Sequence, residues 1–545
     1  FVVAQVALCP RFAMADLTDD SAAWCIYLAI ILFAFCMQLM SSIGMSLDIF
    51  DLLRELVQRR RSSTKSIEKV LEPVAVVVPC YLPNEAPIIK DTVVHLLEKM
   101  TDVEELTVYL VYNTPRRMDV EMDLQALAKN HEWPRGRQLM VHCVEGSKSK
   151  AENLNFIIPS IKEKYTVIYD ADHHPDPPGL AMAVKFLELK QVDCVQGSTY
   201  IRDGSWLLRT FIHAEFFVSY FVVLPMMARL SGTGFFGGAN GIWRTEAVQK
   251  MEFDPEVLTE DIDFCVRGIL RHRLKFVFMP QSRSGELAPS SWSALWKQRL
   301  RWAMGWDQVS TTYASGFCGD HMPWRQRIGL LYIFVCRWLT QFCTVIIVAI
   351  NMTSSLQSWL VEPESIGLVV PSRIHALQNA SAYMYGFMIV CVLTRAVVHE
   401  PSAHLFCGIA IYFAAMPAYL LFTSVILLTS LVRVARGRTG TWVVTARSGA
   451  SVQDTAPSKP LLPQPEEGGG KTQNVAAALV LALGLTMQGA TFGSLAGACL
   501  GRHREEHPKW GWVPFGIGAT YTTSIDGEAV AKGTSTGVLI AAILC

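Results

Sequence analysis

The strongest constraint on the fold is an uncharged run near the beginning of the chain. Residues 21–47 carry no charged side chain. About 20 apolar residues suffice for a helix to cross the hydrocarbon core of a bilayer, so this run predicts a transmembrane helix. It is too long for the core of a signal peptide, and no basic flank precedes it. Arg54, Arg59 and further basic residues follow it, which places the next part of the chain in the cytosol by the positive-inside rule.

Apolar runs return in the second half of the chain. Residues 328–351 and 381–398 are predicted to span the membrane. Residues 402–432 are interrupted by Pro417, and we expect them to form a hairpin or an interfacial segment. A further span is predicted at residues 474–500.

Two of the apolar runs contain polar groups that modify this prediction. The stretch 211–230 includes His213, Glu215 and Pro225, so we expect an interfacial helix near 205–230 rather than a span. Arg337 lies inside the run at 328–351, where an arginine exposed to lipid costs about 3 kcal/mol. We therefore expect Arg337 to face protein or a polar cavity, and it is a candidate residue of a channel.

The composition agrees with a membrane protein and excludes one class of partner. Hydrophobic residues make up 51% of the 545 residues and charged residues only 18%. The formal net charge is zero, which removes any general argument for binding nucleic acid. The 14 cysteines are scattered and form no C-x-x-C pair, so buried free thiols are expected. The chain begins at Phe1 and ends in an apolar run, so both true termini are left open.

These runs divide the chain into segments. The expected segments are an N-terminal segment at 1–20, a transmembrane helix at 21–47, a cytosolic connector at 48–71, a cytosolic domain at 72–320, transmembrane and interfacial helices at 328–432, a short cytosolic segment at 433–450, a polar linker at 451–473, a transmembrane helix at 474–500 and a tail of unknown role at 501–545.

The block at 72–320 begins with alternating strand-like and helix-like segments. The predicted strands are 74–79, 106–112, 139–144 and 165–169, and the predicted helices are 86–99, 119–130 and 150–162. This alternation predicts an α/β domain with a mostly parallel sheet and helices on both faces. Ligands bind at the carboxyl ends of the strands in such sheets.

Asp170 and Asp172 follow the predicted strand at 165–169. Such a pair either caps a turn or holds a hard cation, Mg²⁺ or Mn²⁺, together with substrate phosphates. His173 and His174 raise the question of zinc, but adjacent histidines without a cysteine partner have the wrong spacing for a zinc site. The pair by itself does not decide between a capped turn and a metal site.

A second acidic motif, Thr259-Glu260-Asp261, precedes a helix-like run. Thr259 could cap that helix, with the acidic residues in its first turn. Alternatively, Asp261 is a general base that takes a proton from an attacking hydroxyl. Both interpretations remain open from these residues alone.

Two further motifs accompany the acidic ones. In Trp296–Trp302, a helix would place Gln298, Arg301 and Trp302 on one face, where they could bind phosphate and stack on a sugar. The same pattern also fits an amphipathic helix lying on a membrane surface. The glycines of Phe235–Gly241 either form a plain turn or let the backbone approach a ligand closely.

The four motifs occur together within one block, and predicted transmembrane segments follow that block. In this combination the chain, over roughly residues 20 to 450, resembles the processive, membrane-embedded family 2 glycosyltransferases, which include cellulose, mannan, chitin and hyaluronan synthases. The resemblance implies a glycosyltransferase-A (Rossmann-like) domain inserted between transmembrane helices.

The resemblance also implies roles for residues that match the family motifs. Asp170 and Asp172 match the aspartates that bind the donor and the metal, and Asp261, with Glu260 beside it, matches the catalytic base. Other matched positions are Gln298, Arg301, Trp302, Gly238 and Asn240 for the acceptor and diphosphate, and Asn113, Lys150, Thr445 and Arg447 for the nucleotide sugar. Thr445 and Arg447 belong to a gating-loop-like motif at 442–447.

One departure from the family pattern concerns the nucleotide. Asn113 stands where the family usually has acidic residues that bind the base, although an amide can also bond to a base edge. The donor is expected to be UDP-glucose or GDP-mannose.

The predicted activity is an inverting, processive hexosyl transfer that builds a β-glucan or β-mannan and moves it across the membrane. The predicted partners are the donor, the growing glycan and the bilayer, without nucleic acid, and a homo-oligomer is left open. The predicted location is the plasma membrane or Golgi, with the catalytic domain in the cytosol. The alternatives are transfer of one sugar to a lipid, a transporter, and an inactive synthase subunit.

Overall fold

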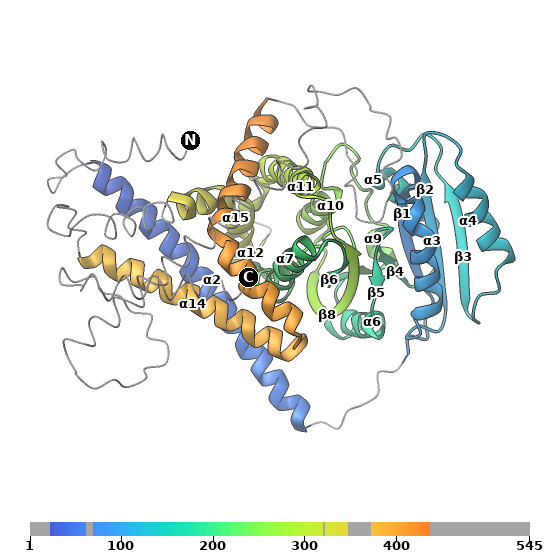
Figure 1. Cartoon of the computed structure of the whole chain (residues 1–545), viewed down its shortest axis with the longest axis horizontal. Coiled ribbons are helices and arrows are strands. Elements are labelled where there is room, and N and C mark those ends of the chain that lie inside the picture. The colour runs from blue at the N-terminus through green and yellow to red at the C-terminus, as the bar shows by residue number, and fades with distance from the viewer. Residues whose placement is uncertain (1–21, 62–68, 320–321, 347–371, 437–545) are drawn as a thin grey trace.

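The computed structural model describes residues 22–61, 69–319, 322–346 and 372–436 (Figure 1). Several predicted segments lie outside these residues. They are 1–20, the part of 433–450 that begins at 437 and includes Thr445 and Arg447, the linker at 451–473, the helix at 474–500 and the tail at 501–545.

The predicted strands of the α/β block form one half of a sheet. They are β1 (Val74–Tyr81), β2 (Leu106–Asn113), β3 (Arg137–Cys143) and β4 (Tyr165–Ile168). All are parallel, with β2 and β4 on opposite sides of β1. Parallel strands are covered on both faces and therefore need continuous apolar runs, which Val74–Val78 provides. Because successive connections leave β1 in opposite directions, the β1–β4 boundary is a switch point, where ligands bind in such sheets.

The second half of the sheet is mixed. It contains β5 (His174–Pro175), β6 (Cys194–Asp203), β7 (Gly241–Arg244) and β8 (Phe276–Leu287). The eight strands follow the order β3-β2-β1-β4-β7-β6-β8-β5. β7 is antiparallel to both β4 and β6, and β5 is antiparallel to β8. The predicted α/β fold class is confirmed, and the sheet has these antiparallel pairs in addition to its parallel ones.

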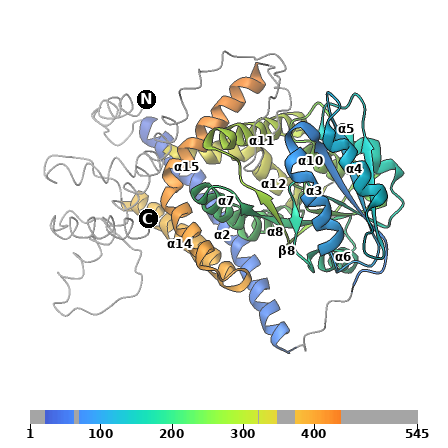
Figure 2. The ribbon, with the colours of Figure 1, turned by 45° about the vertical axis from the view of Figure 1, so that its right-hand side comes forward.

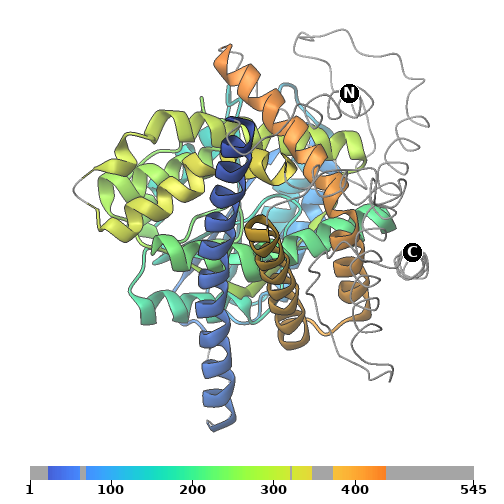
Figure 3. The same cartoon turned by 90° about the vertical axis from the view of Figure 1, so that its left-hand side faces the viewer.

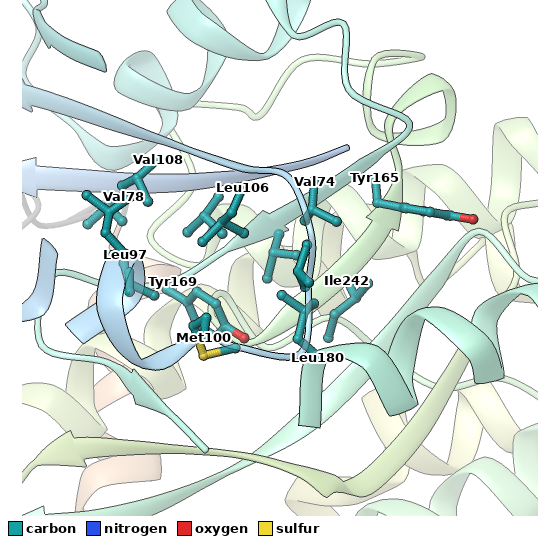
Figure 4. Close-up of a cluster of buried hydrophobic side chains, with 14 of the residues drawn as sticks. Val74, Val78, Leu97, Met100, Leu106, Val108, Tyr165, Tyr169, Leu180 and Ile242 are labelled. Atoms are coloured by element: carbon teal, nitrogen blue, oxygen red, sulfur yellow. The ribbon is translucent and has the colours of Figure 1, made fainter. Parts of the chain in front are cut away.

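Helices cover both faces of the sheet because side chains of a strand alternate between them. Val74, Val76 and Val78 pack on one face against α3 (Leu82–Lys99), α4 (Asp119–Asn130) and α6 (Gly179–Lys190), as Figure 4 shows in part. Ala75 and Val77 point to the opposite face. That face is covered by α5 (Lys150–Ile157), α9 (Thr245–Val248), α10 (Glu260–Arg267) and the C-terminal half of α11 (Trp292–Tyr313).

Long apolar helices lie beside the α/β domain (Figures 1 and 2). Among the described residues, four helical stretches are long and apolar enough to cross a membrane: 29–57, 206–231, 324–346 and 403–435. They belong to α2 (Ala22–Arg61), to α7 (Trp206–Val218) continued by α8 (Leu224–Ser231), to α12 (Trp324–Leu330) with its continuation, and to α15 (Ala403–Ala435). α14 (Ser372–His399) runs beside α2 (Figure 3) and contains a shorter apolar stretch.

The structure corrects one of the two alternatives predicted for residues 402–432. They form no hairpin, because α15 is one continuous helix that contains Pro417, and the interfacial alternative stays a prediction. Proline is tolerated inside such helices because neighbouring helices and local side chains compensate for the missing backbone bond. The stretch predicted to be interfacial, near 205–230, is long enough to span, yet 56% of its most apolar window is buried inside the protein.

Arg337 lies against other groups of the protein, which is one of the two surroundings that we predicted for this residue. It forms an ion pair with Asp307 of α11, whose side chain is fully buried. Asp307 also accepts hydrogen bonds from Trp338 Nε1 at 2.8 Å and from Ser430 Oγ of α15. This cluster joins α11 to two of the apolar helices, and Arg337 is not among the residues that line the main cavity described below.

Candidate active site

A cavity with a volume of about 380 Å³ lies at the carboxyl ends of β1, β2 and β4. Helices α10 and α11 close one side, and α7 with the turn after it closes another. Among the residues that line it are Asn113, Lys150, Asp170, Gly238, Glu260, Asp261, Gln298, Arg301 and Trp302. The fold therefore brings nine of the predicted site residues to one cavity.

Lys150 connects the two acidic motifs. Its Nζ lies 2.6 Å from Asp170 Oδ1, 2.8 Å from the carbonyl oxygen of Gly238 and 3.9 Å from Glu260 Oε1. Burial alone would lower the pKa of this ammonium, but the carboxylates of Asp170 and Glu260 outweigh burial and raise it. Lys150 is therefore a fixed positive charge in the middle of the cavity.

Asp261 has the properties of a general base. It lies in the first turn of α10, and its Oδ1 accepts a hydrogen bond from the Ile262 backbone at 2.9 Å. Burial, followed by the neighbouring Glu260 carboxylate, raises the pKa of Asp261 to about 7, although Lys150 acts in the opposite direction. A base with a pKa near the working pH is the most effective in proton transfer. Thr259 occupies the N-cap position, but its side chain makes no capping hydrogen bond.

The Gln-x-x-Arg-Trp motif lies on α11, as its spacing predicts. Gln298 is buried in the cavity wall, and Arg301 Nη1 lies 3.4 Å from the carbonyl oxygen of Leu258, next to the Thr-Glu-Asp motif. Gly305 allows α11 to lie this close to the Thr-Glu-Asp motif, because a Cβ atom at Gly305 would lie 2.4 Å from Thr259 Oγ1.

Asp172 and Asn240 are placed differently from the other predicted residues. The Asp172 side chain is buried, its Oδ2 accepts a hydrogen bond from the Leu287 backbone at 3.0 Å, and it does not line the cavity. Asn240 is fully buried and donates to the carbonyl oxygens of Ser198 and Ser282 at 2.8 and 2.9 Å. These contacts hold the loops around the site, and the predicted ligand roles of both residues stay predictions.

Asn113 is held by the chain itself. Its Nδ2 donates to the Ser147 carbonyl at 3.0 Å, and its Oδ1 accepts from Asn153 Nδ2 at 2.9 Å. Asn153 also lines the cavity and was not among the predicted site residues, although it lies on the same helix, α5, as Lys150. The two amides therefore form one unit at the end of β2.

Three further cavity residues were missed by the sequence motifs. His173 is buried beside Glu286, with Nε2 3.3 Å from Glu286 Oε2, and both line the cavity. Glu215 also lines it. Its sequence signal was an acidic residue within an apolar run, which we interpreted only as evidence against a span. No local pattern pairs His173 with Glu286, because they meet only when β5 pairs with β8.

A change at Gly238 tests this geometry. Gly238 has a φ of +86°, and a Cβ atom there would lie 2.9 Å from Asp261 Oδ2 and 3.5 Å from Lys150 Nζ. We expect Gly238→Ala to lower the rate of the enzyme's reaction by at least about tenfold, because small displacements of reacting groups are costly. Initial rates of the purified full chain measure this effect.

Gly146→Ala is the matched control. Gly146 has a similar φ of +77°, and no other atom lies within 4 Å of the position that a Cβ atom would take there. Both substitutions carry the same backbone cost of about 1 kcal/mol. Equal losses of activity in the two variants would show that the contact with Asp261 is unimportant.

Comparison with known proteins gives the same assignment for this part of the chain. A family model described as glycosyltransferase like family 2 matches residues 72–305. Probable glucomannan 4-beta-mannosyltransferase 7 of Oryza sativa subsp. japonica is 26% identical over 315 residues, 55% of this chain and 48% of that protein. The poly-beta-1,6-N-acetyl-D-glucosamine synthase of Staphylococcus aureus (strain COL) is 25% identical over 275 residues, 49% of this chain and 63% of that protein. The chain thus spans about half the length of the first relative.

Solved structures are also similar to the chain. A mannosyltransferase from Pyrobaculum calidifontis in complex with GDP-Man and Mn2+ aligns with a TM-score of 0.40 and 18% identity, over 72% of this chain and 99% of that one. The family match at residues 72–305 confirms the predicted enzyme class and the glycosyltransferase fold. Residues 72–305 of the chain therefore match the glycosyltransferases of family 2.

Proposed function

We propose that the chain is an inverting hexosyltransferase that extends a β-linked polysaccharide, a β-glucan or β-mannan, from a nucleotide-sugar donor. The observation that carries this proposal is the single cavity that joins Lys150 and Asp170 to Asp261 and to Arg301 and Trp302. A fixed cation, a buried carboxylate of raised pKa and an arginine next to an aromatic ring are the groups that a glycosyl transfer requires.

The proposed reaction is a single displacement. The acceptor hydroxyl oxygen forms a bond to the anomeric carbon while Asp261 takes the hydroxyl proton. At the same time the bond between that carbon and the diphosphate oxygen breaks, and its electron pair leaves with the nucleoside diphosphate. Lys150 and Arg301 stabilise the negative charge of the leaving group, and attack from the opposite side converts an α-linked donor into a β-linked product.

The acidic residues of the cavity fit a divalent metal only together with the donor. The described part of the chain has no group of three or more His, Cys, Asp or Glu side chains arranged to hold a metal ion. Mg²⁺ and Mn²⁺, however, are commonly bound by one or two carboxylates plus substrate phosphates and water. Asp170, which faces the cavity, would hold such an ion together with the donor's phosphates, and the ion would neutralise charge on the departing diphosphate. Asp172 lies behind Asp170 with its side chain turned away from the cavity, so its ligand role requires a rotation of that side chain.

Removal of the metal is therefore expected to stop the reaction. Excess EDTA should lower the transfer rate by at least about a hundredfold, and added Mg²⁺ or Mn²⁺ should restore it, since charge neutralisation at a leaving phosphate is worth several kcal/mol. Release of nucleoside diphosphate from purified protein measures this rate. Full activity in EDTA would disprove the metal role of Asp170 and Asp172.

The donor and the product form the finer part of the proposal. Relatives named glucomannan 4-beta-mannosyltransferases support a mannose or glucose polymer. Membranes containing the full chain should incorporate label from UDP-glucose or GDP-mannose into a polymer that a linkage-specific β-glucanase or β-mannanase degrades. A single-sugar glycolipid as the product would instead favour transfer to a lipid, and no incorporation from either donor would contradict the proposal.

The arrangement of the helices supports movement of the polymer across a membrane. Glu215 of α7 lines the cavity and accepts a hydrogen bond from Tyr419 of α15. Both α15 and the stretch formed by α7 and its continuation through α8 are long and apolar enough to span. We propose that the catalytic domain faces the cytosol. Protease treatment of sealed vesicles should then cleave residues 72–319 only from the cytosolic side, and the opposite protection pattern would contradict this orientation.

A further inference from the structure

Arg299 is a buried arginine in the wall of the active-site cavity. It follows Gln298 on α11, and only 8% of its surface is exposed. Its guanidinium carbon lies 4.2 Å from the centre of the Trp302 ring and 5.5 Å from that of Phe216. An arginine stacked on an indole in this way restricts the orientation of the ring.

Arg299 is itself held by two other helices. Its Nη2 donates to Glu215 Oε2 of α7 at 2.7 Å. The other oxygen of that carboxylate, Oε1, accepts a hydrogen bond from the Tyr419 hydroxyl of α15 at 2.6 Å. The contacts therefore run without a break from an apolar helix, through Glu215 and Arg299, to the face of Trp302.

This cluster leaves donors without a protein acceptor. Within the described residues, Nε and Nη1 of Arg299 are buried and have no hydrogen-bond partner. Buried polar groups in proteins are nearly always paired, so two such donors on one side chain require an explanation. The wall of the same cavity combines aromatic side chains, Trp302, Trp306 and Tyr220, with the amide of Gln298. Aromatic faces beside hydrogen-bonding groups suit a sugar ring, which has apolar faces and a polar rim.

We propose that Arg299 is a positioning residue for the acceptor sugar. It fixes the Trp302 ring as a stacking surface, and the Glu215–Tyr419 hydrogen bond fixes Arg299. This inference rests on the proposed function, because it assumes that the acceptor is a glycan. It adds that a residue of an apolar helix, Tyr419, controls the affinity for the acceptor without touching the reacting atoms.

Three substitutions in the full-length protein test this role. Arg299→Lys keeps the charge but loses the flat face over Trp302, and Tyr419→Phe removes only the hydroxyl that holds Glu215. Tyr332→Phe is the matched control, because it removes a similar interhelical hydroxyl contact, to Ser41 at 2.8 Å, that lies away from the cavity. Binding of mannohexaose and cellohexaose to the purified proteins is measured by calorimetry, together with donor binding and initial rates.

The expected pattern separates positioning from a loss of folding. Arg299→Lys should weaken binding of the preferred hexasaccharide about tenfold, and Tyr419→Phe about threefold, the sizes of a lost cation–π contact and of a loosened hydrogen bond. Donor binding should stay within about twofold in both variants, and Tyr332→Phe should match the wild type. Hexasaccharide affinity that is unchanged in Arg299→Lys, or lost in step with donor binding, would overturn the inference.

The failure of this inference can be distinguished from a failure of the proposed function. If the wild type binds a hexasaccharide in an Arg299-dependent way but transfers no sugar, the inference holds and the proposed reaction is wrong. If the wild type transfers sugar and Arg299→Lys changes neither hexasaccharide binding nor the acceptor KM, the reaction stands and the inference fails. A wild type that binds neither hexasaccharide overturns the inference.

Discussion

Asp261→Asn is expected to lower kcat for sugar transfer by about a thousandfold, within the range that general acid–base catalysis contributes. Asparagine has nearly the same shape, and its amide oxygen can still accept the Ile262 backbone hydrogen bond seen at 2.9 Å. It cannot take the proton of the acceptor hydroxyl. Donor binding should therefore change by no more than about twofold, while initial rates with a saturating donor report the loss.

Asp254→Asn is the control for this substitution. Asp254 lies in the loop before α10, does not line the cavity, and accepts a hydrogen bond from the Glu256 backbone at 2.9 Å that an amide oxygen can also accept. The same acid-to-amide change there should leave kcat unaltered. An Asp261→Asn enzyme that elongates at the wild-type rate would remove Asp261 from the mechanism.

The pKa of Asp261 also predicts how the activity depends on pH. The base is active when deprotonated, and burial raises the pKa of Asp261 to about 7. Activity should therefore rise with pH through about 7 and should fall about tenfold per pH unit well below it. Measuring kcat/KM between pH 5 and pH 8.5 tests the sign, and a flat profile over this interval would contradict the assignment.

Asp307→Ala is expected to destabilise the protein by about 3–5 kcal/mol, the cost of leaving one partner of a buried ion pair alone. Asp307 is fully buried and accepts from three groups, Arg337, Trp338 and Ser430. Its loss leaves the Arg337 guanidinium without its carboxylate between apolar helices. Unfolding of the detergent-solubilised full chain, followed by tryptophan fluorescence against denaturant or temperature, measures the effect.

Two comparisons with other variants identify the cause of the loss of stability in Asp307→Ala. Asp123→Ala removes an ion pair with Lys90 whose side chains are 59% and 48% exposed, and exposed pairs contribute at most about 1 kcal/mol. Asp307→Leu combined with Arg337→Leu removes both charges and should recover more than half of the stability, since an apolar pair of similar volume avoids the cost of desolvation. A double variant no more stable than Asp307→Ala would indicate that the ion pair is not the cause.

Much of the fold follows from local patterns that the sequence displays directly. The predicted helix at 119–130 has the bounds of α4, and the strands at 74–79 and 106–112 agree with β1 and β2 to within two residues at each end. The continuous apolar run Val74–Val78 places apolar side chains on both faces of the sheet, as a buried parallel strand requires. The antiparallel insertion of β7 between β4 and β6 was not predictable, because no short stretch records which strands will be neighbours.

The hairpin alternative at 402–432 failed for a related reason. Pro417 is a helix breaker in isolated segments, and it was the reason to expect an interruption of this apolar run. In the structure α15 passes through Pro417 while packed against α7 and α11, so neighbouring helices stabilise a conformation that local propensity disfavours.

By itself the sequence determined the α/β class, the motifs and their resemblance to the glycosyltransferases of family 2, because strand and helix periodicity and motif spacing depend on neighbouring residues. Tertiary structure alone decided which groups meet in the cavity. Glu215 and Tyr419 are separated by 204 residues, and Lys150 and Gly238 by 88, yet each pair shares a hydrogen bond. Tertiary structure also turned the Asp172 side chain away from the cavity, toward the backbone of Leu287. Contacts across such distances arise from the packing of whole elements, and that packing also sets the burial that raises the pKa of Asp261.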